Sequence, residues 1–493
     1  MNVKNFPGIR SLLLENRSLK QTLLKNTFWL GLSEGVGRIF RAVLFIYIAR
    51  ILGATDYGKF SFALAVASLF VSFFDMGLSG IITRELARDK KREEDFFALF
   101  SLRILLGFGT LAVVFVCSFF ITEDQYIRKV IWILATFSFI SLFPEIFYAF
   151  LRARQRMEYE SWANMIQIVF VTSCGMFVLF YCPSVLNISL SYLFSSIAAV
   201  TIVFCFFHFR ILPLRLSLDV SVWKRFLAMS WPLALTSIFS MIYGFTDSII
   251  MGYLGQITQT GWYNAALKIV MVTFAPAAII SLNFFPILSQ SARKSQARLQ
   301  KVWNYQLGIM IFMAIPIIVG GISTAPRLIE FFYGSDYSAS VPVFQILIFM
   351  VGTYAFSVTC SQVLIATNHQ GKTFWVAVIG AIINTVLNLI LIPKYSLYGA
   401  AYSAVISNVL MVVIYFAFAF RFASVHPFNT EILFFLIGAL LSSLSMIFVI
   451  SQPFMETLNI LFVILIGTLV YCTILLTGQK ILQRLNIYTF GQA

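Results

Sequence analysis

Long apolar stretches recur along the whole chain, and each is about as long as a membrane-spanning helix. A helix needs about 20 apolar residues to cross the hydrocarbon core of a bilayer. The sequence predicts fourteen such spans, near residues 27–49, 60–83, 96–121, 130–151, 161–181, 185–208, 231–253, 262–288, 304–324, 341–366, 373–392, 397–420, 431–450 and 457–478. The predicted fold class is therefore an all-α polytopic membrane protein.

The composition excludes a soluble fold. Of the 493 residues, 60% are hydrophobic and 11% are charged, whereas about a quarter of the residues in a soluble domain are charged. In hydrocarbon, every backbone N–H and C=O group must be satisfied internally, which leaves helices and closed barrels. The apolar runs are far longer than a barrel strand requires, so helices are expected.

The distribution of basic residues predicts the orientation, because lysine and arginine favour cytoplasmic loops. With the amino terminus inside, the inner segments hold 25 basic residues and the outer loops hold six. This split predicts that both termini are cytoplasmic. It also accounts for the net charge of +15 without a nucleic-acid partner, since the excess faces anionic membrane lipids.

A glycine-containing stretch, LGATDYGKFSFAL at residues 52–64, has the spacing of a phosphate-binding loop at Gly53, Gly58 and Lys59. The next residue is Phe60, where a nucleotide-binding loop needs Ser or Thr for magnesium. An ATP site is therefore rejected.

The same stretch has a second copy, LGQITQTGWYNAA, at residues 254–266. Both copies link the first to the second helix of a group of six, and internal repeats are the usual build of secondary transporters. The predicted domains are a six-helix bundle at 1–215, a second six-helix bundle at 216–425, and an additional helix pair at 426–493.

Eight charged residues lie inside the predicted spans: Glu34, Arg38, Arg41, Asp75, Arg103, Glu145, Asp247 and Lys268. A charge at the centre of a membrane helix costs about 3 kcal/mol, so these residues must pair with one another or line a hydrated cavity.

One face of the first span concentrates this charge. Glu34, Arg38 and Arg41 follow i, i+4, i+7 spacing, so they share a helical face that is expected to look inward. On the same helix, Gly31 and Gly35 form a small-x-x-x-small pair, which is typical of close helix packing.

Three stretches resemble a known family: LGATDYGKFSFALAVASLFVSFFDMGL at 52–78, TRELARDKK at 83–91, and GAIINTVLNLILIPKYSLYGAAYSAVISN at 380–408. They are similar to the oligosaccharide flippases of bacterial polysaccharide biosynthesis, in the multidrug, oligosaccharidyl-lipid and polysaccharide exporter superfamily. The resemblance covers nearly the whole chain. It implies two pseudo-symmetric bundles in a V shape, plus a C-terminal helix pair, in the bacterial cytoplasmic (inner) membrane.

The resemblance also implies an activity. Such a flippase translocates undecaprenyl-pyrophosphate-linked oligosaccharide repeat units, such as those of O-antigen, by alternating access through a charged central cavity. Arginine forks suit a pyrophosphate, so Arg38, Arg41 and Arg103 are the predicted substrate contacts, with Lys268 as a supporting charge. The structural alternative is that Glu34 neutralises Arg38 and that Arg103 snorkels to the inner surface.

The remaining acids raise the question of energy, because no nucleotide site is found. Glu34, Asp75, Asp247 and Glu145 are predicted to serve ion coupling or charge pairing, with Na⁺ or H⁺ as the coupling ion. No other cofactor and no metal site are expected, because the three histidines are isolated and the six cysteines show no C-x-x-C spacing.

Other transporters and two enzyme classes are the alternatives. A multidrug or cation antiporter and a lipid II flippase belong to the same superfamily. A membrane glycosyltransferase or a polysaccharide polymerase is less favoured, because the longest predicted outer loop, 325–340, is short. The protein is therefore predicted not to be an enzyme, with glycosyltransferases and a polymerase of the same pathway as partners.

Two smaller patterns concern the helices themselves. Pro232, Pro276, Pro286 and Pro316 fall in predicted spans and are expected to kink or interrupt them. Asn384 and Asn388, one turn apart, are expected to form interhelical hydrogen bonds.

Overall fold

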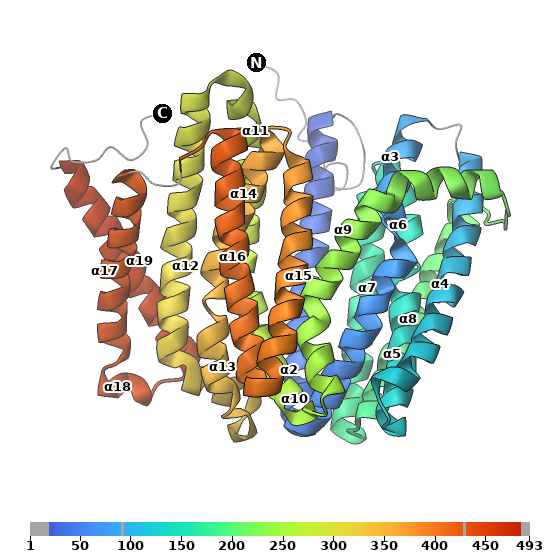
Figure 1. The fold of residues 1–493 in the computed structure, drawn as a ribbon, viewed down its shortest axis with the longest axis horizontal. Helices are drawn as coiled ribbons and strands as arrows, with labels where there is room; N and C mark the ends of the chain where they lie inside the picture. Colours follow the sequence, from blue (N-terminus) through green and yellow to red (C-terminus); the bar gives the residue numbers. More distant parts are fainter. Residues whose placement is uncertain (1–18, 90–92, 427–429, 485–493) are drawn as a thin grey trace, which may run out of the picture. The chain divides into compact units, whose positions relative to one another are not determined.

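The computed structural model describes residues 19–89, 93–426 and 430–484, nearly all of them helical (Figure 1). The helices of the first half are α2 (Leu19–Asp75), α3 (Leu78–Arg88), α4 (Glu93–Ile121), α5 (Gln125–Leu142), α6 (Glu145–Ala153), α7 (Met157–Tyr181), α8 (Val185–Arg210) and α9 (Val220–Tyr253). Those of the second half are α10 (Ile257–Val272), α11 (Ala275–Lys294), α12 (Gln296–Tyr333), η2 (Ser335–Tyr337), α13 (Ser340–Leu347), α14 (Met350–Ala366), α15 (Gln370–Tyr395), α16 (Leu397–Ala423), α17 (Thr430–Ile450), α18 (Pro453–Glu456) and α19 (Ile460–Arg484).

The described residues contain 13 helical stretches long and apolar enough to cross a membrane. The first, Lys25–Arg88, has 64 residues, about three times the length that one crossing needs. Gly53 interrupts the helix within it, at φ 76°. The start of α2 and the helix α3 both lie at the upper edge of Figure 1, so the chain reverses between them. This stretch therefore supplies two crossings, which confirms the predicted all-α polytopic fold with fourteen membrane helices.

Some predicted boundaries needed correction. The predicted outer loop at 325–340 is helical as far as Tyr333, where α12 ends, and α13 begins at Ser340. Pro276 follows a true interruption between α10 and α11, as predicted, whereas Pro232, Pro286 and Pro316 lie inside helices. The terminal residues and part of one inner segment that supported the orientation, Lys4, Arg10, Arg17, Lys90, Lys91 and Arg92, lie outside the described residues.

The chain divides into two compact units, Met1–Gly261 and Trp262–Ala493. Helix α9 was expected to open the second bundle, but it packs against α2, α3 and α4 in the first unit. The division at 215/216 and 425/426 stays a prediction about the repeats.

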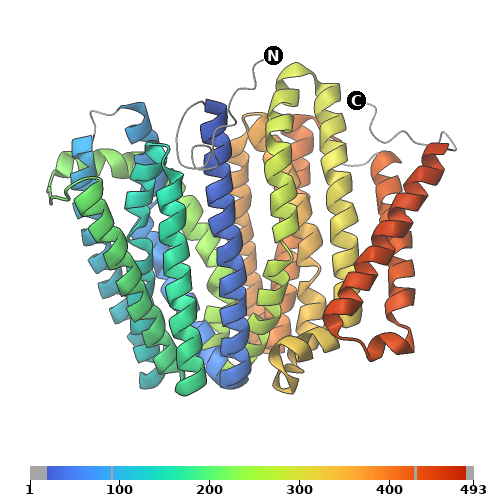
Figure 2. The same ribbon diagram turned by 180° about the vertical axis from the view of Figure 1, so that it is seen from behind.

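In the first unit, α2 packs against α5, α7 and α9. From behind, α7 lies beside the first stretch of α2 (Figure 2). The apolar core of the unit joins α3, α4, α6 and α8, where the ring of Phe207 stacks on Phe147 at 4.5 Å and on Phe96 at 5.7 Å. Burial of these large rings holds α3, α4, α6 and α8 against one another.

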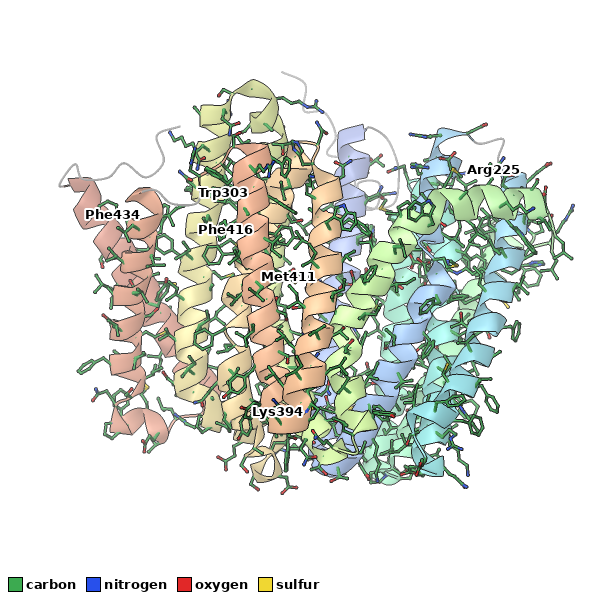
Figure 3. All side chains as sticks on the ribbon, in the orientation of Figure 1. Arg225, Trp303, Lys394, Met411, Phe416 and Phe434 are labelled. Carbon is green, nitrogen blue, oxygen red and sulfur yellow. The ribbon has the colours of Figure 1, made fainter. Side chains whose placement is uncertain are left out.

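Helix α9 begins as a stretch that runs across the view before the helix turns along the bundle (Figure 1). The Asp219 carboxylate caps it by accepting the N–H groups of Ser221 and Val222. A hydrogen bond from the Ser221 hydroxyl, together with these backbone bonds, lowers the pKa of Asp219. Arg225, labelled on this stretch in Figure 3, forms an ion pair with Asp95 of α4.

In the second unit, α12 and α16 meet through Trp303 and Phe416, whose ring centroids are 6.4 Å apart (Figure 3). Helices α15 and α16 pack closely where Met411 covers Gly380. The amide of Asn384 donates to Ser407 Oγ of α16 at 3.1 Å and accepts from Asn388 at 3.0 Å. The predicted interhelical hydrogen bond is confirmed for Asn384, whereas Asn388 donates to Asn384 within the same helix.

The two copies of the glycine turn have the same backbone geometry. Gly53 and Gly255 have positive φ angles of 76° and 74°. A β-carbon on Gly58 would lie 1.9 Å from the carbonyl oxygen of Ile257, and one on Gly261 would lie 2.0 Å from that of Ala54. The contact is thus reciprocal, and only glycine fits on either side.

Two threonine hydroxyls meet beside these glycines, with 2.8 Å between Thr55 Oγ1 and Thr258 Oγ1. In a variant without the native cysteines, Thr55→Cys with Thr258→Cys is expected to form a disulfide on mild oxidation, because the two sulfur atoms would start within reach of a bond. Peptide mass spectrometry would detect the cross-link. Thr55→Cys with Thr260→Cys is the matched control, since Thr260 instead donates to the Gln256 carbonyl. Equal cross-linking in both pairs would contradict the reciprocal contact.

Candidate functional site

One face of α2 carries the charges that the sequence singled out in the first span. Arg38 Nε donates to Glu34 Oε1 at 3.0 Å, and Arg41 Nη2 lies 3.7 Å from the same oxygen. The exposed fractions of the three side chains are 58% for Glu34, 52% for Arg38 and 49% for Arg41. The shared face is confirmed, and the described residues leave it about half open rather than packed.

The glycines on this helix do not form the packed seam that the sequence suggested. A β-carbon on Gly31 or Gly35 would meet nothing within 4 Å. Gly37 differs, because a β-carbon there would lie 2.7 Å from Ile168 of α7 and 3.3 Å from the Arg41 guanidinium. The small residues at 31 and 35 therefore leave space beside the charged face instead of admitting a neighbouring helix.

This arrangement gives the face a definite chemistry. Two guanidinium groups share one carboxylate, so the cluster carries a net positive charge. A guanidinium has five N–H donors, and the ion pairs of Arg38 and Arg41 involve one carboxylate oxygen of Glu34. The remaining donors suit a planar or tetrahedral oxyanion that approaches through the open side.

Arg103, the third predicted substrate contact, is not part of this face. Its side chain is fully buried on α4, with Nη1 3.1 Å from Asp75 Oδ1 and Nη2 donating to the Leu142 carbonyl at 3.0 Å. Nη1 also donates to Ser79 Oγ at 2.9 Å. The guanidinium therefore neither snorkels to a surface nor lies open to a ligand in this conformation, and Asp75 serves charge pairing.

Glu145 is also paired. It accepts from Arg152 Nη1 at 2.7 Å, and the same guanidinium binds Glu160 of α7 through Nε at 2.9 Å. Two residues before Glu160, Glu158 joins α7 to α2, with 2.8 Å between its Oε2 and Lys25 Nζ. The sequence reasoning missed these pairings, although the run RARQRMEYE at 152–160 places acids directly after the inner basic residues.

The last two predicted residues lie elsewhere. Asp247 of α9 is 6% exposed, and its Oδ1 accepts the Ser248 N–H at 2.7 Å. Lys268 is partly exposed on α10, in the second unit. In the part of the chain that the structure describes, no group of three His, Cys, Asp or Glu side chains is arranged to hold a metal ion.

The second unit contains an apolar cavity of about 480 Å³. Its walls come from α10, α12, α13, α17 and α19 and include Phe312, Pro316, Met446, Val463 and Gly467. The volume lies within the range of small-molecule sites, and the lining suits a hydrocarbon chain.

Comparison with known proteins identifies the family. The family model described as polysaccharide biosynthesis protein matches residues 23–292, and a second model, MatE, matches residues 232–390. The chain is 24% identical to the probable low-salt glycan biosynthesis flippase Agl15 of Haloferax volcanii over 50% of this chain and 52% of that protein, so the match spans about half of each. It is 20% identical to a putative O-antigen transporter of Shigella flexneri over 78% of this chain and 94% of that one.

Among solved structures, the fold is similar to that of the lipid II flippase MurJ in an inward closed conformation. The TM-score is 0.76 at 16% identity, covering 93% of this chain and 99% of that one. At this identity the likeness concerns the fold. Because the first family model matches more than half of the sequence, this chain belongs to the polysaccharide biosynthesis protein family.

Proposed function

We propose that this protein is a flippase that moves undecaprenyl-pyrophosphate-linked oligosaccharide units from the inner to the outer leaflet of a cytoplasmic membrane. The open charged face of α2 is the observation that carries the proposal. Two arginines stand about half exposed within an apolar membrane helix, where each charge costs about 3 kcal/mol unless a partner or water compensates it. A diphosphate group would supply that compensation.

The cargo's chemistry explains the other features. Its lipid tail can remain in hydrocarbon, whereas its diphosphate and sugar cannot. In the first unit, Arg38 and Arg41 would hold the diphosphate through charge-assisted hydrogen bonds. Lys268, in the second unit, stays a predicted supporting charge. The apolar cavity of the second unit suits part of the tail. The names of the relatives, a glycan flippase and an O-antigen transporter, support the same class of cargo.

The net positive charge of the α2 face distinguishes between the alternative transporter classes. A cationic drug would be repelled by a cluster with two guanidinium groups and one carboxylate. This disfavours a multidrug or cation antiporter. A lipid II flippase also carries a diphosphate-linked sugar, and a structural relative bears that name. It is therefore the second candidate function.

The arginines can be tested directly. Arg38→Ala and Arg41→Ala are each expected to lower flipping of a fluorescent polyprenyl-diphosphate-linked disaccharide in proteoliposomes by at least tenfold, because hydrogen bonds to charged groups contribute about 1.5–3 kcal/mol. The yield of folded protein is expected to stay unchanged, because both side chains are about half exposed. Ile39→Ala is the control, as Ile39 is an exposed neighbour without charge. Normal flipping by the double alanine variant would remove this face from the cargo site.

Coupling to an ion gradient is a separate part of the proposal. Asp247 is buried in a membrane helix, and acids in such positions can serve ion or proton pathways. An imposed proton or sodium gradient is expected to raise the wild-type flipping rate several-fold, while Asp247→Asn lowers this response. Asp75→Asn tests the other candidate. Flipping that ignores both gradients in the wild type would show that the cargo's own gradient drives transport.

A further inference from the structure

Arg103 is buried where two broken helices meet. On one side it binds Asp75 and Ser79, and on the other side it donates to the carbonyl of Leu142. Asp75 is the last residue of α2, and Leu142 is the last residue of α5. One guanidinium therefore spans the ends of two helices that are far apart in sequence.

The first of these interruptions is a true break in the backbone. Between α2 and α3, Met76 and Gly77 have positive φ angles of 45° and 66°. A side chain is strained in this conformation, and glycine is not. A β-carbon on Gly77 would also lie 2.7 Å from Leu233 Cβ and 2.9 Å from Ala234 N of α9. Both the backbone conformation and the close contact therefore require glycine at position 77.

The second interruption has a different cause. Phe143 and Pro144, between α5 and α6, keep helical φ and ψ angles. Pro144 has no N–H group and its ring crowds the preceding turn, which interrupts the hydrogen bonds of the helix. The Leu142 carbonyl lies at this break, and it accepts a hydrogen bond from Arg103 Nη2 at 3.0 Å.

A third helix, α9, has a proline beside the break at Gly77. Leu233 and Ala234, which Gly77 touches, directly follow Pro232 inside α9. The breaks at α2–α3 and α5–α6 and the proline inside α9 are therefore linked through Arg103 and Gly77. Prolines and breaks at one level allow helices to bend there.

The fork of arginine is essential to this link. Its two terminal nitrogens point to different helix ends, and a lysine ammonium has no such geometry. The Phe74 ring lies 4.7 Å from the guanidinium carbon. Among the described residues, Nε has no hydrogen-bond partner although it is buried, which costs about 1–3 kcal/mol.

Beyond the breaks, α3 and α6 form one packed piece. Leu78 and Ile82 of α3 belong to the same buried cluster as Ile146 and Phe147 of α6. Thr83 Oγ1 also donates to the Ala149 carbonyl at 3.3 Å.

We propose that Arg103 is a positioning residue that makes α3 and α6 move together, as one body, about the level of Asp75, Gly77 and Leu142. The inference rests on the proposed function only in that this bending serves transport. The coupling itself is a property of the first unit.

Hydrogen–deuterium exchange tests the coupling without any cargo. In the wild type, amides of 78–82 and 145–149 are expected to exchange with opening rates within threefold of each other. In Arg103→Lys, which keeps the charge beside Asp75 but loses the fork, the two rates should separate by at least tenfold. Unrelated rates in the wild type, or unchanged rates in Arg103→Lys, would overturn the proposal.

Pro144→Ala tests whether the bend serves transport. Alanine restores an N–H that can donate to the Ile140 carbonyl and removes the proline ring. The helix can then continue from α5 into α6, with the Leu142 carbonyl accepting the Ile146 N–H. The thermal midpoint is expected to hold or rise, while flipping of the polyprenyl-diphosphate-linked disaccharide falls at least tenfold. Arg103→Lys with Pro144→Ala should regain the thermal midpoint but not flipping. Recovery of both would show that Arg103 only satisfies a carbonyl, and would overturn the proposal.

A glycine pair supplies the matched control. Gly77→Ala is expected to reduce flipping at least tenfold. Gly80→Ala, within α3, is expected to reduce it less than twofold, because a β-carbon there meets Leu233 Cδ1 at an ordinary 3.7 Å. Equal effects of the two substitutions would count against a bend at Gly77. If the wild type does not move the disaccharide, the proposed function fails, while the exchange rates still decide the coupling.

Discussion

Hydrogen bonding of the backbone inside hydrocarbon is the constraint on which this structure depends. Every N–H and C=O group must find a partner within the protein, so the chain is helical nearly everywhere. Wherever a helix stops inside the membrane, a side chain or a close backbone contact has to replace the missing turn. Arg103 does this for the end of α5, and its burial follows from that requirement rather than from a ligand.

The same constraint sorts the membrane charges into two kinds. Arg103 with Asp75, and Arg152 with Glu145 and Glu160, are closed sets in which acid and base satisfy one another. Removing one member of such a buried pair leaves an uncompensated charge. The cluster on α2 is different, because it is open on one side and has an excess of positive charge. A difference in exposure, rather than in residue type, separates the face that we propose binds the cargo from the charges that pair within the protein.

The sequence predicted the membrane helices well because hydropathy and length depend on the chain alone. It also placed Glu34, Arg38 and Arg41 correctly on one face, since helical spacing decides that locally. The partners of Arg103 depend on where α2, α3 and α5 meet, which no local pattern states. Pro144 was visible within a predicted span, yet its significance depends on the guanidinium opposite. The role of Gly31 and Gly35 was misjudged for the same reason, because spacing cannot show whether a neighbouring helix is present.

The reciprocal contact of the two glycine turns has a consequence for how such a chain could arise. Gly58 faces Ile257 as Gly261 faces Ala54, which is the pattern of an isologous dimer interface, in which the same patch meets itself. A half-length protein with this turn would already have matched a second copy of itself. Joining two copies into one polypeptide leaves the interface intact, and ties the evolution of the two turns together: a larger residue in either displaces both.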